Sequence, residues 1–171
     1  MYKVKWLIYV RVCVISILLA TILTIAFNYL GLVDNSSYAE IASKQFGISD
    51  SVFVMFIIYC ILSPIIEEVI FRYGIYNFIH RKLTSKTVNL LYVKAHSFLG
   101  YSLSKAQVLS VWITALLFGL YHLNLVQGTY AFIMGLFITY CYAAYQKLSV
   151  PFAAHAAANV VAFAFTFCIH S

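Results

Sequence analysis

Three charged side chains lie within one long apolar stretch, and this combination constrains the fold more than any other feature of the chain. The stretch runs from Val52 to Ile79 and contains Glu67, Glu68 and Arg72. Each charge costs roughly 2.5–3.5 kcal/mol at the centre of a membrane helix, about 8 kcal/mol in all. The sixteen Leu, Ile, Phe and Val residues of the stretch return about 0.3–0.6 kcal/mol each, roughly 7 kcal/mol in all. The charges must therefore face a protein interior in which they find partners.

Helical spacing gives the two acids different roles. Glu68 and Arg72 are four residues apart, so they lie on one helix face and are expected to form an ion pair. Glu67 points about 100° away and has no counter-ion at that spacing. This makes Glu67 a candidate general base. The alternative is that both acids only join helices through polar contacts.

The composition is that of a membrane protein. Of the 171 residues, 64% are hydrophobic and 9% are charged, with a mean hydropathy of +0.93. These values exclude a soluble globular domain. The sequence predicts an all-α fold, a polytopic transmembrane helical bundle with about five membrane helices. We expect these helices at about residues 5–33, 51–80, 106–123, 130–146 and 151–170.

Lysine and arginine predict the orientation of the bundle. Five spans with the N-terminus in the cytoplasm place nine basic residues inside and only Lys44 outside. The net charge of +6 is explained by this bias, so no nucleic-acid partner is expected. The lipid bilayer is the expected environment, and the expected location is a multi-pass position in a bacterial plasma membrane.

Three segments are expected to differ from a simple membrane-spanning helix. The helix at 51–80 is longer than the ~20 residues needed to cross a bilayer, and tilt or a kink at Pro64 would absorb the excess. Residues 38–46 have the pattern of a short amphipathic helix. Part of the basic segment 81–105 is expected to lie on the membrane surface.

Two further helices carry polar side chains at helical spacing. Phe118 and His122 share one face, and so do His155 and Asn159 within a run of alanines. Each pair alone is explained by interfacial or interhelical hydrogen bonding. Taken with the acids, however, three separate helices each contribute groups that can take part in catalysis.

These residues resemble the motifs of the CAAX-protease and bacteriocin-processing family, called CPBP or Abi, of intramembrane endopeptidases. The family motifs E-E-x-x-x-R, F-x-x-x-H and H-x-x-x-N stand here as Glu67 to Arg72, Phe118 to His122 and His155 to Asn159. The resemblance covers about residues 55–165. Tyr73 follows the motif arginine directly, where many members have glycine, and the chain is short for the family. Residues 1–50 are then an N-terminal transmembrane helix with a polar loop, and residues 51–171 the catalytic helical core.

The resemblance implies hydrolysis of a peptide bond in a membrane-associated peptide or protein. Glu67 would activate water, and His122 would help to hold that water. His155 and Asn159 would face the scissile carbonyl, with Asn159 donating to the oxyanion. The ion pair of the first motif would hold the site together. A leader peptide, pheromone or bacteriocin is the expected substrate, in processing or in immunity.

Other readings of the same residues remain open. No cofactor is favoured, but zinc bound by Glu67, His122 and His155 is the alternative. The sequence lacks H-E-x-x-H and supplies no obvious hydrogen-bond partner for either histidine, which disfavours the metal. A small transporter or proton-relay protein, or a non-catalytic membrane immunity or binding protein, is the alternative function.

The catalytic reading requires helices that are not simply upright. In straight up-and-down helices, His122, His155 and Glu67 would lie at different depths in the bilayer. Broken or strongly tilted helices around a polar cavity would bring them to one level.

Overall fold

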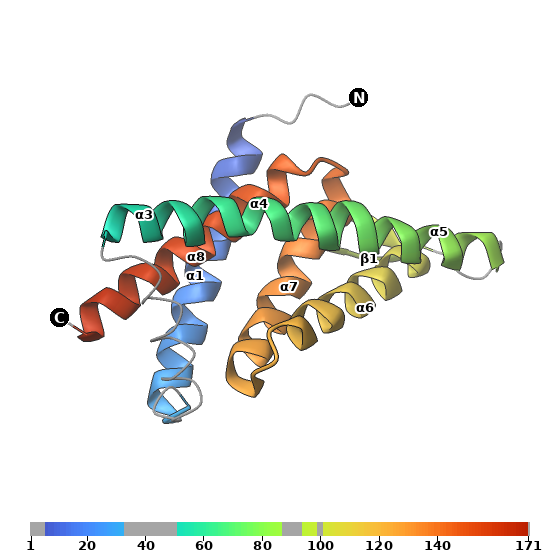
Figure 1. The fold of residues 1–171 in the computed structure, drawn as a ribbon. Coiled ribbons are helices and arrows are strands. Elements are labelled where there is room, and N and C mark those ends of the chain that lie inside the picture. Colours follow the sequence, from blue (N-terminus) through green and yellow to red (C-terminus); the bar gives the residue numbers. More distant parts are fainter. Residues whose placement is uncertain (1–5, 33–50, 87–93, 99–100, 171) are drawn as a thin grey trace.

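The computed structural model describes residues 6–32, 51–86, 94–98 and 101–170, and its framework is helical (Figure 1). One long helix consists of five consecutive segments: α3 (Val52–Phe56), η1 (Ile57–Leu62), α4 (Ser63–Glu68), η2 (Val69–Tyr76) and α5 (Asn77–Lys86). The other elements are α1 (Trp6–Tyr29), β1 (Lys94–Phe98), β2 (Tyr101–Ser104), α6 (Lys105–Tyr121), α7 (Leu125–Tyr145) and α8 (Ser149–His170).

Four helices of the described residues are long and apolar enough to cross a membrane. They are the helices that span Trp6–Tyr29, Val52–Ser85, Leu125–Tyr145 and Ser149–Thr166. Helix α6 is apolar but shorter, with 17 residues. The prediction of an all-α fold with about five helices is therefore confirmed, with four of them as candidate membrane spans and α6 as a shorter fifth helix. The orientation of the bundle stays a prediction.

A short two-stranded hairpin, which the sequence did not predict, accompanies the helices. Strands β1 and β2 pair antiparallel, with Phe98 opposite Tyr101 and Lys94 opposite Ser104. The hairpin lies in the basic segment for which a membrane-surface position was predicted. The amphipathic helix predicted at residues 38–46 lies outside the described residues.

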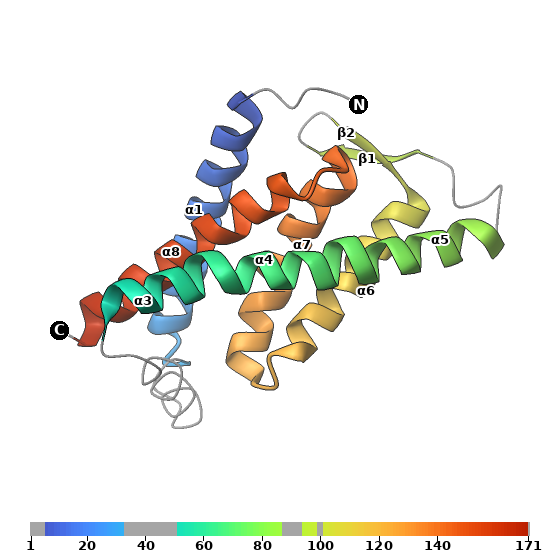
Figure 2. The same cartoon turned by 45° about the horizontal axis from the view of Figure 1, so that its top comes forward.

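The long helix passes through Pro64 without a break (Figures 1 and 2). Segments η1 and η2 are π-helices, which place an extra residue in each turn. In η1 the Ser63 N–H donates to the Ile58 carbonyl, five residues back. The next bond in this register would run from Pro64 to the Tyr59 carbonyl, but proline has no N–H. The helix therefore changes type next to Pro64 and continues, and Pro64 supplies no backbone hydrogen bond to the Tyr59 carbonyl.

The long helix crosses the other helices instead of lying parallel to them (Figures 1 and 2). Helix α6 packs mainly against α7, and α1 packs mainly against α8. The Ser16 hydroxyl of α1 donates to the Ala154 carbonyl of α8 at 2.5 Å, and both residues are fully buried. Because the helices cross, residues at different fractions of their lengths can meet. Glu67, His122 and His155 therefore need not lie at the different depths that upright helices would give them.

The turn between α6 and α7 is fixed by its polar residues. The Asn124 side chain accepts hydrogen bonds from the N–H groups of Val126 and Gln127 and so caps α7. Next to it, Leu123 has a φ of +52°, and His122 ends α6. Gly119 and Gly128 let the two helices approach closely, because a Cβ on Gly119 would lie 2.7 Å from the Gly128 carbonyl oxygen. This turn therefore holds His122 in a defined place.

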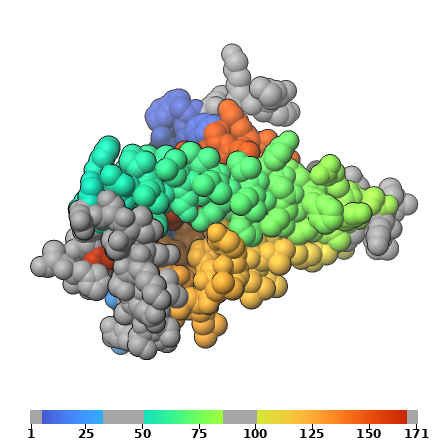
Figure 3. Space-filling model, viewed as in Figure 1, coloured from blue at the N-terminus to red at the C-terminus, as the bar shows by residue number. Residues whose placement is uncertain are grey.

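One face of the long helix is apolar and exposed. Its side chains recur at helical spacing: Leu62, Ile65, Ile66, Val69, Ile70 and Tyr73. Figure 3 shows the long helix as a continuous band across one side of the molecule. An exposed apolar stripe of this kind suits contact with lipid. Glu68 and Arg72 are buried instead, in the interior of the protein.

Candidate active site

The best-buried charges form an ion pair within the long helix. Arg72 Nη1 lies 3.0 Å from Glu68 Oε1, as the i,i+4 spacing predicted. The arginine is fully buried and Glu68 is 2% exposed. The guanidinium carbon also lies 4.5 Å from the centre of the Phe118 ring, a favourable cation–π contact. Both charges therefore have partners on the protein side of the helix.

His155 joins the two acids. Its Nδ1 lies 2.7 Å from Glu68 Oε1 and its Nε2 lies 3.5 Å from Glu67 Oε2. Because an ionised carboxylate only accepts hydrogen bonds, Nδ1 carries the hydrogen of the shorter contact. Glu68 thereby orients the imidazole, and the second nitrogen faces Glu67. The Glu68 carboxylate is shared between Arg72 and His155, whereas the sequence had assigned it to Arg72 alone.

Glu67 is more accessible than its neighbour, with a side chain that is 14% exposed. The Ser63 hydroxyl, one helical turn earlier, donates to Glu67 Oε1 at 2.7 Å. Ser63 was not among the site residues predicted from the sequence, although its i,i+4 spacing from Glu67 indicates the contact. Glu67 is thus held by a hydroxyl on one side and approached by His155 on the other.

Asn159 is held by the backbone carbonyl of Tyr59, to which Pro64 cannot donate a hydrogen bond. Its Nδ2 donates to the Tyr59 carbonyl oxygen at 2.9 Å, from one turn beyond His155 on α8. The amide has two N–H donors, so this bond leaves a second one for another acceptor. The role of Pro64 here could not be read from the sequence, because it depends on the π-helical register of η1.

His122 is connected to the other site residues through Phe118. Its Nδ1 lies 2.9 Å from the Phe118 carbonyl oxygen, which can only accept, so Nδ1 carries hydrogen and Nε2 is free to face a substrate or water. The Phe118 ring packs edge-on against His122 at 5.0 Å and against His155 at 5.7 Å. The structure therefore brings Glu67, Glu68 and His155 into direct contact and places His122 one ring away.

Both histidines have hydrogen-bond partners, so the expected lack of such partners no longer disfavours a metal. Glu68 orients His155 and the Phe118 carbonyl orients His122, so each histidine has the partner that the sequence did not supply. Within the part of the chain that the structure describes, no three His, Cys, Asp or Glu side chains are grouped to hold a metal ion. The choice between a metal and a metal-free mechanism remains a prediction.

Comparison with models of protein families identifies a family for most of the chain. A family model described as "Type II CAAX prenyl endopeptidase Rce1-like" matches residues 49–161, which include all three motifs. No curated protein and no solved structure matches the chain. The match leaves α1 outside and covers the long helix, α6, α7 and more than half of α8.

Proposed function

The chain belongs to the Rce1-like type II CAAX prenyl endopeptidase family, and we propose that it hydrolyses a peptide bond of a membrane-associated peptide or protein. The observation that carries this proposal is the position of His155 between two carboxylates, one fixed by Arg72 and one more accessible. A pair of acids in different environments, one buried and one more accessible, is the arrangement expected when one acid is structural and the other reacts.

Glu67 is the proposed general base. Its carboxylate takes a proton from a water molecule, and the resulting hydroxide attacks the scissile carbonyl carbon. The C–N bond then breaks, and the proton on Glu67 passes to the leaving amine. The proposed role of His155, whose Nε2 lies 3.5 Å from Glu67, is to orient the water. Glu68 and Arg72 act by positioning His155.

Asn159 and His122 are the proposed contacts to the reacting carbonyl and the water. The second N–H of Asn159 donates to the developing oxyanion, while the first remains bonded to the Tyr59 carbonyl. The free Nε2 of His122 accepts a hydrogen bond from the attacking water. In this assignment the carbonyl of Tyr59 holds the asparagine in place before substrate arrives.

The direct test compares wild-type protein with Glu67→Gln. Two assays run in parallel: peptidomics of cells that contain each variant, and cleavage of a prenylated CAAX peptide by protein purified in detergent. Loss of the base should lower the rate about 10²–10⁴-fold. Ile66→Leu is the matched control, because Ile66 is adjacent and 59% exposed on the apolar face. Equal cleavage by Glu67→Gln and wild type would show that Glu67 is not the base.

A second experiment decides the metal question. Purified protein is assayed after exhaustive chelation, and its metal content is measured on the same sample. We expect activity to survive, since the proposed mechanism needs only the side chains named above. Stoichiometric zinc, with activity lost on its removal and restored on its return, would make Glu67, His122 and His155 ligands instead.

A further inference from the structure

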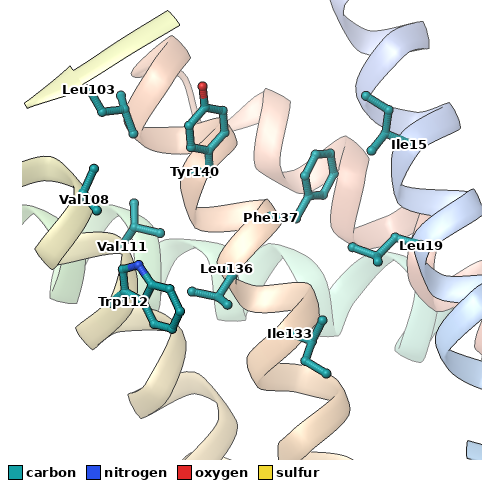
Figure 4. Close-up of a pocket in the computed structure, with 10 residues that line it drawn as sticks. All are labelled: Ile15, Leu19, Leu103, Val108, Val111, Trp112, Ile133, Leu136, Phe137 and Tyr140. Carbon is teal, nitrogen blue, oxygen red and sulfur yellow. The ribbon is translucent and has the colours of Figure 1, made fainter. Parts of the chain in front are cut away.

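A groove outside the candidate site lies between α1, α6 and α7 and extends to β2 (Figure 4). Its volume is about 430 Å³, within the ~300–1,000 Å³ of ordinary small-molecule sites. None of the residues that line it belongs to the candidate active site. Helix α1 packs against α8 and α7, and this groove lies between α1 and α6.

The walls of the groove are almost entirely hydrocarbon. Side chains of α7, including Ile133 and Phe137, face Ile15 and Leu19 of α1 on one side and Trp112 of α6 on the other (Figure 4). Apart from the Trp112 indole N–H and the Tyr140 hydroxyl, these walls offer no hydrogen-bonding groups for a peptide backbone, whose polar groups are costly to bury unpaired. A flexible hydrocarbon chain is the occupant that suits them.

One end of the groove is polar and basic. Tyr140 lines the groove, and its hydroxyl donates to the Tyr101 carbonyl at 3.3 Å. The rings of Tyr101 and Tyr145 are 4.8 Å apart, and Arg11 is close enough to Tyr145 to interact with it electrostatically. Arg11 also precedes Ile15 by one helical turn, so it lies on the groove side of α1. The hydrocarbon walls thus lead to a guanidinium.

The positive charge at this end is not neutralised by the described part of the chain. The two carboxylates that the structure describes, Glu67 and Glu68, are both engaged at the candidate site. Lys105, the exposed first residue of α6, adds a second positive charge three residues before the groove residue Val108. An anionic group is therefore the complement that this end lacks.

We propose that the groove binds an anionic phospholipid, with one acyl chain between α1 and α6 and the phosphate beside Arg11 and Lys105. Basic sites between membrane helices are known to select anionic headgroups. A neutral lipid would fill the same apolar walls but would carry no net charge for the two cations. The bound lipid would connect α1 to α6. This inference does not depend on the proposed peptidase activity.

The test uses Trp112 as a reporter, because it lies in the groove and is 53% exposed. The chain has two tryptophans, so the Trp6→Phe variant leaves Trp112 as the only tryptophan. This protein is reconstituted in phosphatidylcholine, and brominated phosphatidylglycerol or brominated phosphatidylcholine with the same acyl chains is added at low mole fraction. Bromine quenches tryptophan on contact, so stronger quenching by the anionic lipid measures selective binding.

Two variants test separately the binding of the lipid headgroup and the binding of the acyl chain. Arg11→Gln should weaken the preference for phosphatidylglycerol about five-fold, the effect of one basic residue near a lipid headgroup. Leu136→Phe, which fills part of the groove, should reduce quenching by both lipids. Lys82→Gln on α5 and Leu18→Phe on the exposed side of α1 are the matched controls and should match the parent protein.

Each other outcome would overturn the proposal. Equal quenching by the two brominated lipids, or an unchanged preference in Arg11→Gln, would mean that the basic end selects no headgroup. No effect of Leu136→Phe would place the lipid elsewhere. A dimer that Leu136→Phe dissociates would show that a second copy of the chain occupies the groove.

Discussion

Replacing Glu68 by glutamine should destabilise the protein far more than the same change at Glu67. Glu68 is 2% exposed and its carboxylate serves Arg72 at 3.0 Å and His155 at 2.7 Å. Glutamine leaves a fully buried guanidinium without its counter-ion, and breaking a buried pair in this way costs about 3–5 kcal/mol. At Glu67, glutamine can still accept the Ser63 hydrogen bond, so the cost there is about 1 kcal/mol. The difference between the two variants is therefore about 2–4 kcal/mol.

The measurement is reversible unfolding of purified protein in mixed detergents, followed by tryptophan fluorescence. The matched control is the double variant Glu68→Gln with Arg72→Met, which removes the unpaired cation and should recover at least half of the lost free energy. Equal unfolding free energies for Glu67→Gln and Glu68→Gln would refute the division of roles between the acids. No recovery in the double variant would show that His155, and not Arg72, is the main partner of Glu68.

Three other changes test the fold and the site. Gly119→Ala should cost about 1–3 kcal/mol in thermal unfolding, because its Cβ would lie 2.7 Å from the Gly128 carbonyl oxygen. Gly74→Ala is its control, since the nearest atom there is 3.6 Å away; equal stability of the two variants would contradict the close approach of α6 and α7. Asn159→Ala should lower kcat about 10²–10³-fold with little change in KM, and an unchanged kcat would remove the amide from the reaction. Reporters fused at residue 90 should be cytoplasmic, and those at residue 42 and at the C-terminus external, so a cytoplasmic C-terminus would contradict five spans.

Local spacing predicted the contacts that lie within one helix. The pairing of Glu68 with Arg72 follows from a four-residue interval, and the structure has it at 3.0 Å. The same rule applied to Ser63 would have found the partner of Glu67. The helices long and apolar enough to cross a membrane and the family could also be predicted from the sequence, because they depend on composition and on motif residues that stand in order along the chain.

Contacts between helices could not be predicted in this way. The bond from His155 to Glu68 joins residues 87 positions apart, and it depends on how α8 crosses the long helix. The bond from Asn159 to the Tyr59 carbonyl further requires a π-helical turn before Pro64, which no residue pattern in that stretch indicates. The depths expected for His122, His155 and Glu67 differed for the same reason, because they were derived from helices that all stand upright.

Because the long helix is longer than a bilayer is thick, the thickness of the surrounding bilayer is expected to affect the geometry of the candidate site. Its 34 residues from Val52 to Ser85 span about 50 Å, whereas the hydrocarbon core of a typical bilayer is about 30 Å thick. A helix of this length that crosses a bilayer leans or extends beyond the hydrocarbon, and a thicker or thinner bilayer changes its preferred inclination. Both acids lie near the middle of this helix, while His155 belongs to another. A change in bilayer thickness is therefore expected to change the angle between the long helix, which carries the two acids, and α8, which carries His155.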